Sequence, residues 1–312
     1  MKEKINKSLI ISICLIVILL IIVVLLILHN PSNKKWILDG TTITKGDTVL
    51  KIGDIYEYDE TNSGKVEGLT DTDWKVLGVS DEGNLLIMST TNVEEVKLGD
   101  KDNLETSQND YIQGVDKLND LAKKYSQGKN AISARSIKTE DINKLTNYNP
   151  LDFGIDSSHQ YNNEVTYYWS NESNPIYEGT NNTNGTLTSK HENGFIWYNA
   201  ETKEWNTSEK KLHVGIETIE KEKIATIRSN WYAYDNQYFD KESSIYKMLF
   251  LDSAGNIADY WLANQFTYTA NMFVGYGYQL VNGDRVNYRY LLYSQGTPRE
   301  DTAGLRVVVE ID

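Results

Sequence analysis

Residues 8–28 form an uncharged run of 21 residues, SLIISICLIVILLIIVVLLIL, without proline or glycine. An α-helix rises about 1.5 Å per residue, so a helix of this length would extend about 31 Å, close to the thickness of a bilayer's hydrocarbon core. A helix also pairs its backbone N–H and C=O groups internally, as lipid requires. The run therefore predicts an N-terminal transmembrane helix over residues 8–28, with the membrane as a partner of the chain.

The charges beside this run predict its orientation. Lys2, Lys4 and Lys7 precede it, whereas Lys34 and Lys35 follow at a greater distance. Basic residues stay on the cytoplasmic side, which predicts a single-pass protein of the cell membrane, its N-terminus cytoplasmic and its C-terminal domain extracellular. The domains would be a cytoplasmic tail (1–7), the transmembrane helix (8–28), a tether (29–40) and the extracellular domain (41–312). A cleaved signal peptide is the alternative, but its apolar core is normally shorter and followed by small residues.

Cysteine content and charge exclude several classes of function. Cys14 is the only cysteine and lies inside the apolar run. The region after it therefore has no disulfide, thiol nucleophile or cysteine-ligated zinc, and a hydrophobic core must stabilise it. The net charge of −13 argues against nucleic acid as a partner.

Apolar patterns in the first half of the domain predict three local structures. Residues 74–79 and 85–89 flank the turn SDEGN and predict a β-hairpin. Residues 110–126 have apolar side chains at helical spacing, with Asn109 or Asp110 as N-cap and Gly128 as C-cap. Residues 131–150 predict a strand followed by a short helix, with Thr139 as N-cap.

The second half of the domain predicts mostly strands. Residues 155–193 are rich in Asn, Ser, Thr and Gly and predict a long exposed excursion. Short strands are expected at residues 195–198, 245–251, 260–263, 272–274, 288–292 and 305–311. The fold class expected is α+β: an N-terminal transmembrane helix followed by a strand-rich domain with one or two helices.

Five segments carry a resemblance to a known family. They are WKVLGV at 74–79 with LIMST at 86–90, ARSIKTEDINKLTNYN at 134–149, YWLAN at 260–264, VNGDRVN at 281–287 and GLRVVVEID at 304–312. Together they resemble an uncharacterised family of bacterial and phage surface proteins whose C-terminal domain is C-type-lectin-like, akin to formylglycine-generating enzymes. The resemblance implies a fold and no reaction, and Val307 stands where the family often has proline. The cysteines of formylglycine-generating enzymes and the E-P-N or Q-P-D triplets of calcium-dependent lectins are both missing from this domain.

Few residues indicate catalysis or metal binding. H-E-x-x-H, G-x-S-x-G, a phosphate-binding loop and a dinucleotide fingerprint are all missing from the sequence. Asp235, Asp240 and Glu242 lie near Trp231 and Tyr238, as the carboxylates of a glycan hydrolase would, or they form a solvated acidic loop. No cofactor is expected. Calcium stays open because Asp100, Asp102 and Asn103 have calcium-like spacing, although the glycine and glutamate of an EF-hand are missing.

The tyrosines are the most informative feature of the domain. The chain has 21 of them, and many fall after residue 230. Tyrosine offers a large contact area and one polar tip, which suits binding surfaces, although alternate tyrosines in strands are also commonly core residues. The candidate ligand-binding residues are Trp231, Tyr268, Tyr276, Tyr278, Tyr288 and Tyr290. We expect an extracellular binding module whose ligand is a protein or a cell-surface glycan. The alternatives are a cell-wall glycan hydrolase with a carboxylate pair and a structural envelope protein.

Overall fold

A computed structural model describes residues 16–21, 35–58, 72–146, 160–161, 164–170, 176–179, 185–186, 195–208, 221–232, 240–269, 273–283 and 285–312. The strands are β1 (Ile37–Asp39), β2 (Thr42–Lys45), β3 (Thr48–Lys51), β4 (Ile55–Tyr56), β5 (Trp74–Val79), β6 (Leu85–Ser89), β7 (Glu94–Gly99), β8 (Ala131–Ser136), β9 (Gln160–Tyr161), β10 (Glu164–Ser170), β11 (Ile176–Gly179), β12 (Gly185–Thr186), β13 (Phe195–Asn199), β14 (Glu204–Ser208), β15 (Lys221–Arg228), β16 (Trp231–Tyr232), β17 (Asp259–Thr269), β18 (Val274–Asn282), β19 (Arg285–Tyr293), β20 (Thr297–Pro298), β21 (Glu300–Leu305) and β22 (Val307–Ile311). The helices are α2 (Leu104–Lys123), the 3-10 helix η2 (Lys124–Gln127), α3 (Thr139–Thr146) and α4 (Ser244–Phe250).

The prediction of a transmembrane helix over residues 8–28 is corrected by the structure. Residues 16–21 are the part of this segment that the structure describes, and they are helical. No helix among the described residues is long and apolar enough to cross a membrane. A uniformly apolar run has neither caps nor a periodic pattern, so it sets how long a helix could be without fixing where one begins or ends. The membrane partner and the location inferred from this run stay predictions.

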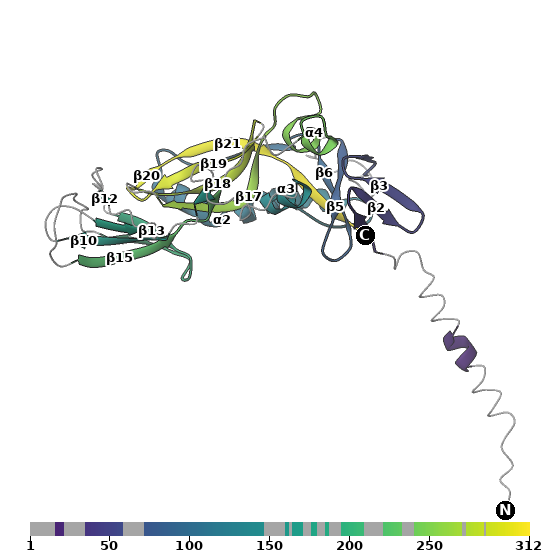
Figure 1. The fold of residues 1–312 in the computed structure, drawn as a ribbon, viewed down its shortest axis with the longest axis horizontal. Coiled ribbons are helices and arrows are strands. Elements are labelled where there is room, and N and C mark those ends of the chain that lie inside the picture. Colours follow the sequence, from purple (N-terminus) through teal and green to yellow (C-terminus); the bar gives the residue numbers. More distant parts are fainter. Residues whose placement is uncertain are drawn as a thin grey trace, which may run out of the picture.

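Two large sheets form the centre of the molecule (Figure 1). One has six strands in the order β20-β19-β18-β17-β21-β7, and the other has five in the order β4-β5-β6-β22-β8. The β17–β21 pair is parallel, and the other pairs in both sheets are antiparallel. Smaller sheets lie toward the two ends of Figure 1, with β2 and β3 at one end and β10, β13 and β15 at the other. The domain is therefore strand-rich, as predicted, but it contains the three α-helices α2, α3 and α4 where one or two were expected.

The last two strands join the two large sheets. β21 belongs to the six-stranded sheet, β22 belongs to the five-stranded sheet, and Arg306 is the single residue between them. Arg306 is fully buried, and its guanidinium donates to the backbone oxygens of Met248 at 2.8 Å and Leu251 at 2.7 Å. The guanidinium also lies 4.7 Å from the ring centroid of Tyr260. A strand that changes sheets is thus fixed at its turning point by a buried cation.

Two sequence predictions of local structure are confirmed. β5 and β6 form the expected hairpin, and Gly83 in its turn has φ +86°, which glycine adopts without strain. β8 is followed by the short helix α3, as predicted. The cap of α3 differs from the prediction, because Asp141 Oδ2 accepts the N–H of Lys138 at 2.8 Å while the Thr139 hydroxyl donates to Gln279 Oε1 at 2.7 Å.

Helix α2 begins earlier than its apolar pattern predicted. Asn103 is the N-cap, and its Oδ1 accepts the N–H of Thr106 at 3.1 Å, so Asn109 and Asp110 lie inside the helix. The first turn lacked a strongly apolar pattern, and the cap therefore had to be identified from its side-chain geometry. The 3-10 turn η2 extends the segment to Gly128, where the predicted C-cap lies.

One further prediction is wrong, and two predicted segments are described in part. A strand is predicted at residues 245–251, but residues 245–250 belong to helix α4, because the Ser243 hydroxyl accepts the N–H of Tyr246 at 3.1 Å and caps the first turn. The predicted tether 29–40 is part of the fold where it is described, since β1 pairs with β2 and Trp36 joins the core. The described parts of the 155–193 excursion include β10, β11 and β12, which form a sheet with β15. The remaining residues of both segments lie outside the described structure.

Candidate functional site

The predicted aromatic residues do not share one surface, because strand side chains alternate between the two faces of a sheet. Tyr276 and Tyr278 of β18 point toward α2 and are fully buried. The ring centroids of Tyr276 and Tyr111 lie 5.4 Å apart, and the hydroxyl of Tyr278 donates to the backbone oxygen of Tyr111 at 2.8 Å. Burial raises the pKa of Tyr111 and of Tyr278 above the usual range. These two predicted ligand-binding residues are therefore core residues.

The other three predicted tyrosines with described side chains gather on the opposite face of the same sheet. Tyr268, Tyr288 and Tyr290 are half-buried there together with Phe273 and Tyr293. We call these five residues the tyrosine layer. Tyr290 lies at its centre, with ring centroids 5.2 Å from Tyr288, 6.3 Å from Tyr268, 6.1 Å from Phe273 and 4.9 Å from Tyr293. Burial is the main cause of the raised pKa of Tyr290.

Two glycines of β18 make room for the tyrosine layer. A Cβ atom at Gly275 would lie 2.2 Å from Cε1 of Tyr290, and a Cβ at Gly277 would lie 2.9 Å from Cε1 of Phe266 and 1.9 Å from the backbone oxygen of Arg289. The sequence GYGY thus places tyrosines on the α2 face and bare backbone on the other face. The rings of β19 can lie close to the sheet for this reason.

The remaining predicted residues do not join this layer. Trp231 is in β16, which pairs with β9, and its side chain lies outside the described structure. Asp235 lies outside it too. Asp240 Oδ1 accepts the N–H of Glu242 at 3.0 Å, and Glu242 pairs with Lys247 at 3.1 Å, so these carboxylates organise the turn before α4. Of the three carboxylates considered for a glycan hydrolase, the two that are described, Asp240 and Glu242, therefore have partners within this turn.

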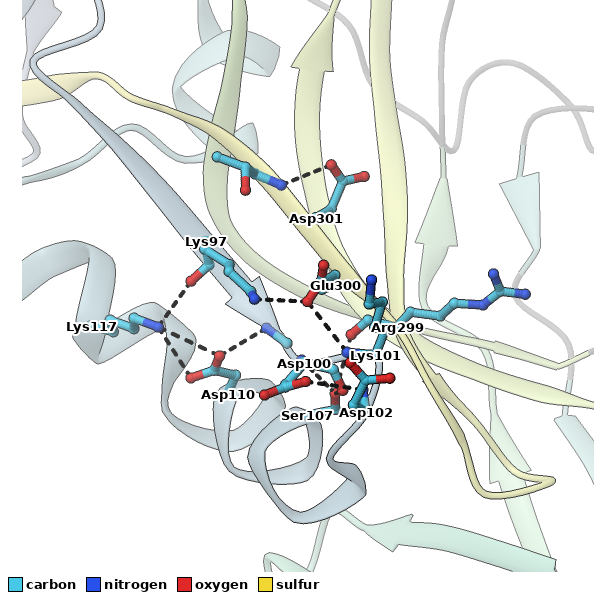
Figure 2. A network of polar contacts seen from close by, with 12 residues as sticks. Lys97, Asp100, Lys101, Asp102, Ser107, Asp110, Lys117, Arg299, Glu300 and Asp301 are labelled. Carbon is cyan, nitrogen blue, oxygen red and sulfur yellow. Dashed lines mark hydrogen bonds and ion pairs between the residues drawn. The ribbon is translucent and has the colours of Figure 1, made fainter.

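Two of the residues with calcium-like spacing, Asp100 and Asp102, belong to a network of polar contacts beside α2 (Figure 2). Asp100 Oδ1 accepts the N–H of Asp102 at 3.0 Å, while Asn103 caps α2. In the same network Lys97 pairs with Glu300 at 2.7 Å. Over the described ranges, no three His, Cys, Asp or Glu side chains are grouped to hold a metal ion.

A polar hollow of about 400 Å³ was not anticipated from the sequence. This hollow, which we call the polar hollow, lies beside the loop after α4. Its other walls are the first residue of β17, the strand β21 and the segment that leads into β7. Its lining residues are Thr91, Asn92, Glu95, Asp252, Ile257, Ala258, Asp259, Thr302, Ala303 and Arg306. Three buried atoms of these residues, Asn92 Oδ1, Asp259 Oδ1 and Arg306 Nε, have no hydrogen-bond partner among the described residues. Buried polar atoms are normally paired, which makes this grouping informative.

Two carboxylates of the polar hollow have opposite electrostatic environments. Burial raises the pKa of Asp259, although Asn282 donates to its Oδ2 at 3.1 Å. The side chain and backbone of Asn256 lower the pKa of Asp252 through hydrogen bonds. Asp252 thus accepts hydrogen bonds within its own turn, whereas Oδ1 of Asp259 has no partner in the part of the chain that the structure describes.

Little in the sequence pointed to the polar hollow. Its residues come from three segments that only the sheet topology brings together. The one signal was Arg306 within the apolar strand GLRVVV, since an arginine there must be paired or functional.

Comparisons with models of protein families, with curated proteins and with solved structures found no match for this chain. The resemblance to C-type-lectin-like surface proteins therefore stays a prediction.

Proposed function

We propose that this protein is a binding module that recognises a glycan through the tyrosine layer. The observation that carries the proposal is the gathering of Tyr268, Tyr288 and Tyr290 on the sheet face opposite α2, above the bare backbone of Gly275 and Gly277. Half-buried tyrosines present a rigid ring and a hydroxyl, which suits the stacking and hydrogen bonding of a sugar ring.

The extent of exposed apolar surface favours a glycan over a broad protein interface. Protein interfaces commonly involve a contiguous apolar patch. The large apolar side chains that are well exposed in the described domain, such as Val49, Ile132 and Ile257, come from separate strands and loops, and none belongs to the tyrosine layer. A protein ligand is the alternative that the test below separates.

Hydrolysis is less well supported than binding. Asp240 and Glu242 are engaged in the turn before α4, and Asp252 accepts hydrogen bonds from Ala254 and Asn256. A glycan hydrolase needs two carboxyl groups free to face one bond. We therefore propose that the protein binds a glycan and does not hydrolyse it.

The test is retention of the full-length protein on a glycan array and on isolated cell walls. Tyr288→Ala should reduce retention about tenfold or more, since an aromatic ring that contacts the ligand directly is worth more than about 1.4 kcal/mol. Tyr288→Phe should retain most of the binding because the ring remains. Tyr278→Phe is the matched control on the buried face. Equal retention of Tyr288→Ala and the wild type, or retention lost only after protease treatment of the cell walls, would contradict glycan recognition.

A further inference from the structure

Arg299 places a positive charge beside the tyrosine layer. Its guanidinium carbon lies 5.4 Å from the ring centroid of Tyr293, within the range of a cation–π contact, and the same centroid lies 4.9 Å from that of Tyr290. Tyr293 and Tyr290 are half-buried, whereas Arg299 is exposed. A short chain of sugars that lies on the rings can therefore extend to the guanidinium across accessible surface.

The backbone of Arg299 is fixed by its neighbours. Its N–H donates to the backbone oxygen of Leu291 in β19 at 2.7 Å, and its carbonyl oxygen accepts the hydroxyl of Ser107 in α2 at 3.1 Å. A Cβ atom at Gly99, the last residue of β7, would collide with the same carbonyl oxygen. Three elements of the fold thus determine where the arginine side chain starts.

The guanidinium of Arg299 has no carboxylate partner in the part of the chain that the structure describes. The two acidic residues that follow it are engaged elsewhere. Glu300 pairs with Lys97 at 2.7 Å, and Asp301 pairs with Arg289 at 2.6 Å. Figure 2 shows the Arg299 side chain pointing away from both carboxylates. The arginine is therefore available to an anion from outside the chain.

The charge beside the tyrosine layer is opposite in sign to the charge of the chain. Burial raises the pKa of Tyr293, and the nearby charge that acts on this tyrosine is the Arg299 guanidinium, which opposes the rise. The chain as a whole carries −13. Charges are screened beyond about 8 Å at physiological ionic strength, so distant acidic residues do not cancel a nearby arginine. An anionic group on a ligand would meet a favourable potential there.

We propose that the glycan bound by the tyrosine layer is anionic and that Arg299 pairs with its carboxylate or phosphate group. This inference rests on the proposed recognition of a glycan and adds the class of glycan that is preferred. Sugar rings would stack on the tyrosines while the acidic substituent lies against the guanidinium. Arginine offers two parallel N–H donors to a carboxylate or a phosphate, and such charge-assisted hydrogen bonds are about twice as strong as neutral ones.

The test compares matched glycans that differ in charge. Pentagalacturonic acid is compared with its methyl ester, and mannopentaose 6-phosphate with mannopentaose, as immobilised probes for the full-length protein. The acidic member of at least one pair should bind about tenfold more tightly at about 50 mM salt, and the difference should shrink at about 500 mM salt. A preference in the first pair alone identifies a carboxylate, and in the second alone a phosphate. Equal binding within both pairs would overturn the inference.

Variants test the role of Arg299. Arg299→Gln changes an exposed side chain and should keep the fold, which circular dichroism checks. It should bind the acidic probe about tenfold more weakly and the neutral probe as the wild type does. Arg299→Lys should keep part of the preference, since lysine offers a point charge without the planar fork. Arg228→Gln, at an exposed arginine of β15, is the matched control and should behave as the wild type. A preference that persists in Arg299→Gln would contradict the assignment.

The same probes separate this inference from the proposed function. If the wild type binds none of the four glycans, or if Tyr288→Ala binds them all as the wild type does, recognition of a glycan by the tyrosine layer is wrong and the inference fails with it. If Tyr288→Ala loses both members of a pair that the wild type binds equally, recognition stands and only the preference for an anion is wrong.

Discussion

The ring of Tyr290 occupies the space that a side chain at Gly275 would need. A Cβ atom there would lie 2.2 Å from Cε1 and 2.5 Å from Cδ1 of that ring. The two residues are on adjacent strands, β18 and β19, whose pairing shifts by one residue between Tyr276 and Gly277. Close packing of the tyrosine layer therefore requires glycine at position 275 as well as the aromatic rings themselves.

Gly275→Ala should lower the free energy of unfolding by about 1–3 kcal/mol, since the added methyl group displaces Tyr290. Gly78→Ala is the control, because a Cβ at Gly78 meets nothing within 4 Å. Urea unfolding followed by tyrosine fluorescence measures both. The packing argument would be wrong if the two variants lost the same stability.

Asn103→Ala should destabilise the protein by about 1 kcal/mol, because the first turn of α2 loses its capping acceptor. Asn109→Ala should have an effect within about 0.5 kcal/mol, since Asn109 is exposed inside the helix. The sequence pattern favoured Asn109 or Asp110 as the cap, so the pair of variants also tests that correction. Thermal unfolding, monitored by circular dichroism, measures the change in stability of both variants.

Arg306→Met should lower the free energy of unfolding by roughly 3 kcal/mol, because the backbone oxygens of Met248 and Leu251 lose their donors. Arg306→Lys should lose less, since one donor can remain. Arg228→Met is the control: its ion pair with Glu164 is exposed and worth about 0–1 kcal/mol. Urea unfolding measures both variants, and the shift of the midpoint gives the loss of stability when the dependence of the unfolding free energy on urea concentration is unchanged. Equal losses in Arg306→Met and Arg228→Met would contradict the stabilising role of the buried guanidinium.

The raised pKa of Asp259 makes a prediction about pH. Burial favours its protonated form in the folded state, so the resulting stability is fully present below the ordinary pKa of 3.8 and is lost as pH rises through the higher folded pKa. Asp259→Asn cannot ionise and avoids this loss. The stability of the variant relative to the wild type should therefore increase between pH 3.5 and neutral pH, as measured by urea unfolding at several pH values. A difference that stays constant with pH would show that burial does not act on this carboxylate.

The fold could be predicted best where the physics is local. The β5–β6 hairpin is fixed by two apolar runs and a turn containing Gly83, and β8 followed by α3 is fixed by its pattern of residues. Predictions failed where tertiary packing decides. Residues 245–251 have the composition of a strand, yet the cap at Ser243 and burial make them a helix.

The candidate site illustrates a second limit. Alternation along GYGY meant that Tyr276 and Tyr278 share one face, but the sequence did not reveal which face α2 covers. The register shift between Tyr276 and Gly277 then determines which rings of β19 lie above the glycines. The polar hollow is lined by residues that lie far apart in the chain, so no sequence motif indicates it.

The strand pair β21–β22 also dictates when the two large sheets can form. β21 separates β17 from β7, and β22 separates β6 from β8, so each sheet has a gap in its middle until residues 300–311 arrive. A growing chain on the ribosome would expose the unpaired edges of β6, β7 and β8 throughout the synthesis of the segments that follow them. Assembly from such distant pairings is slow, and the unpaired strand edges are prone to aggregation until residues 300–311 have been synthesised.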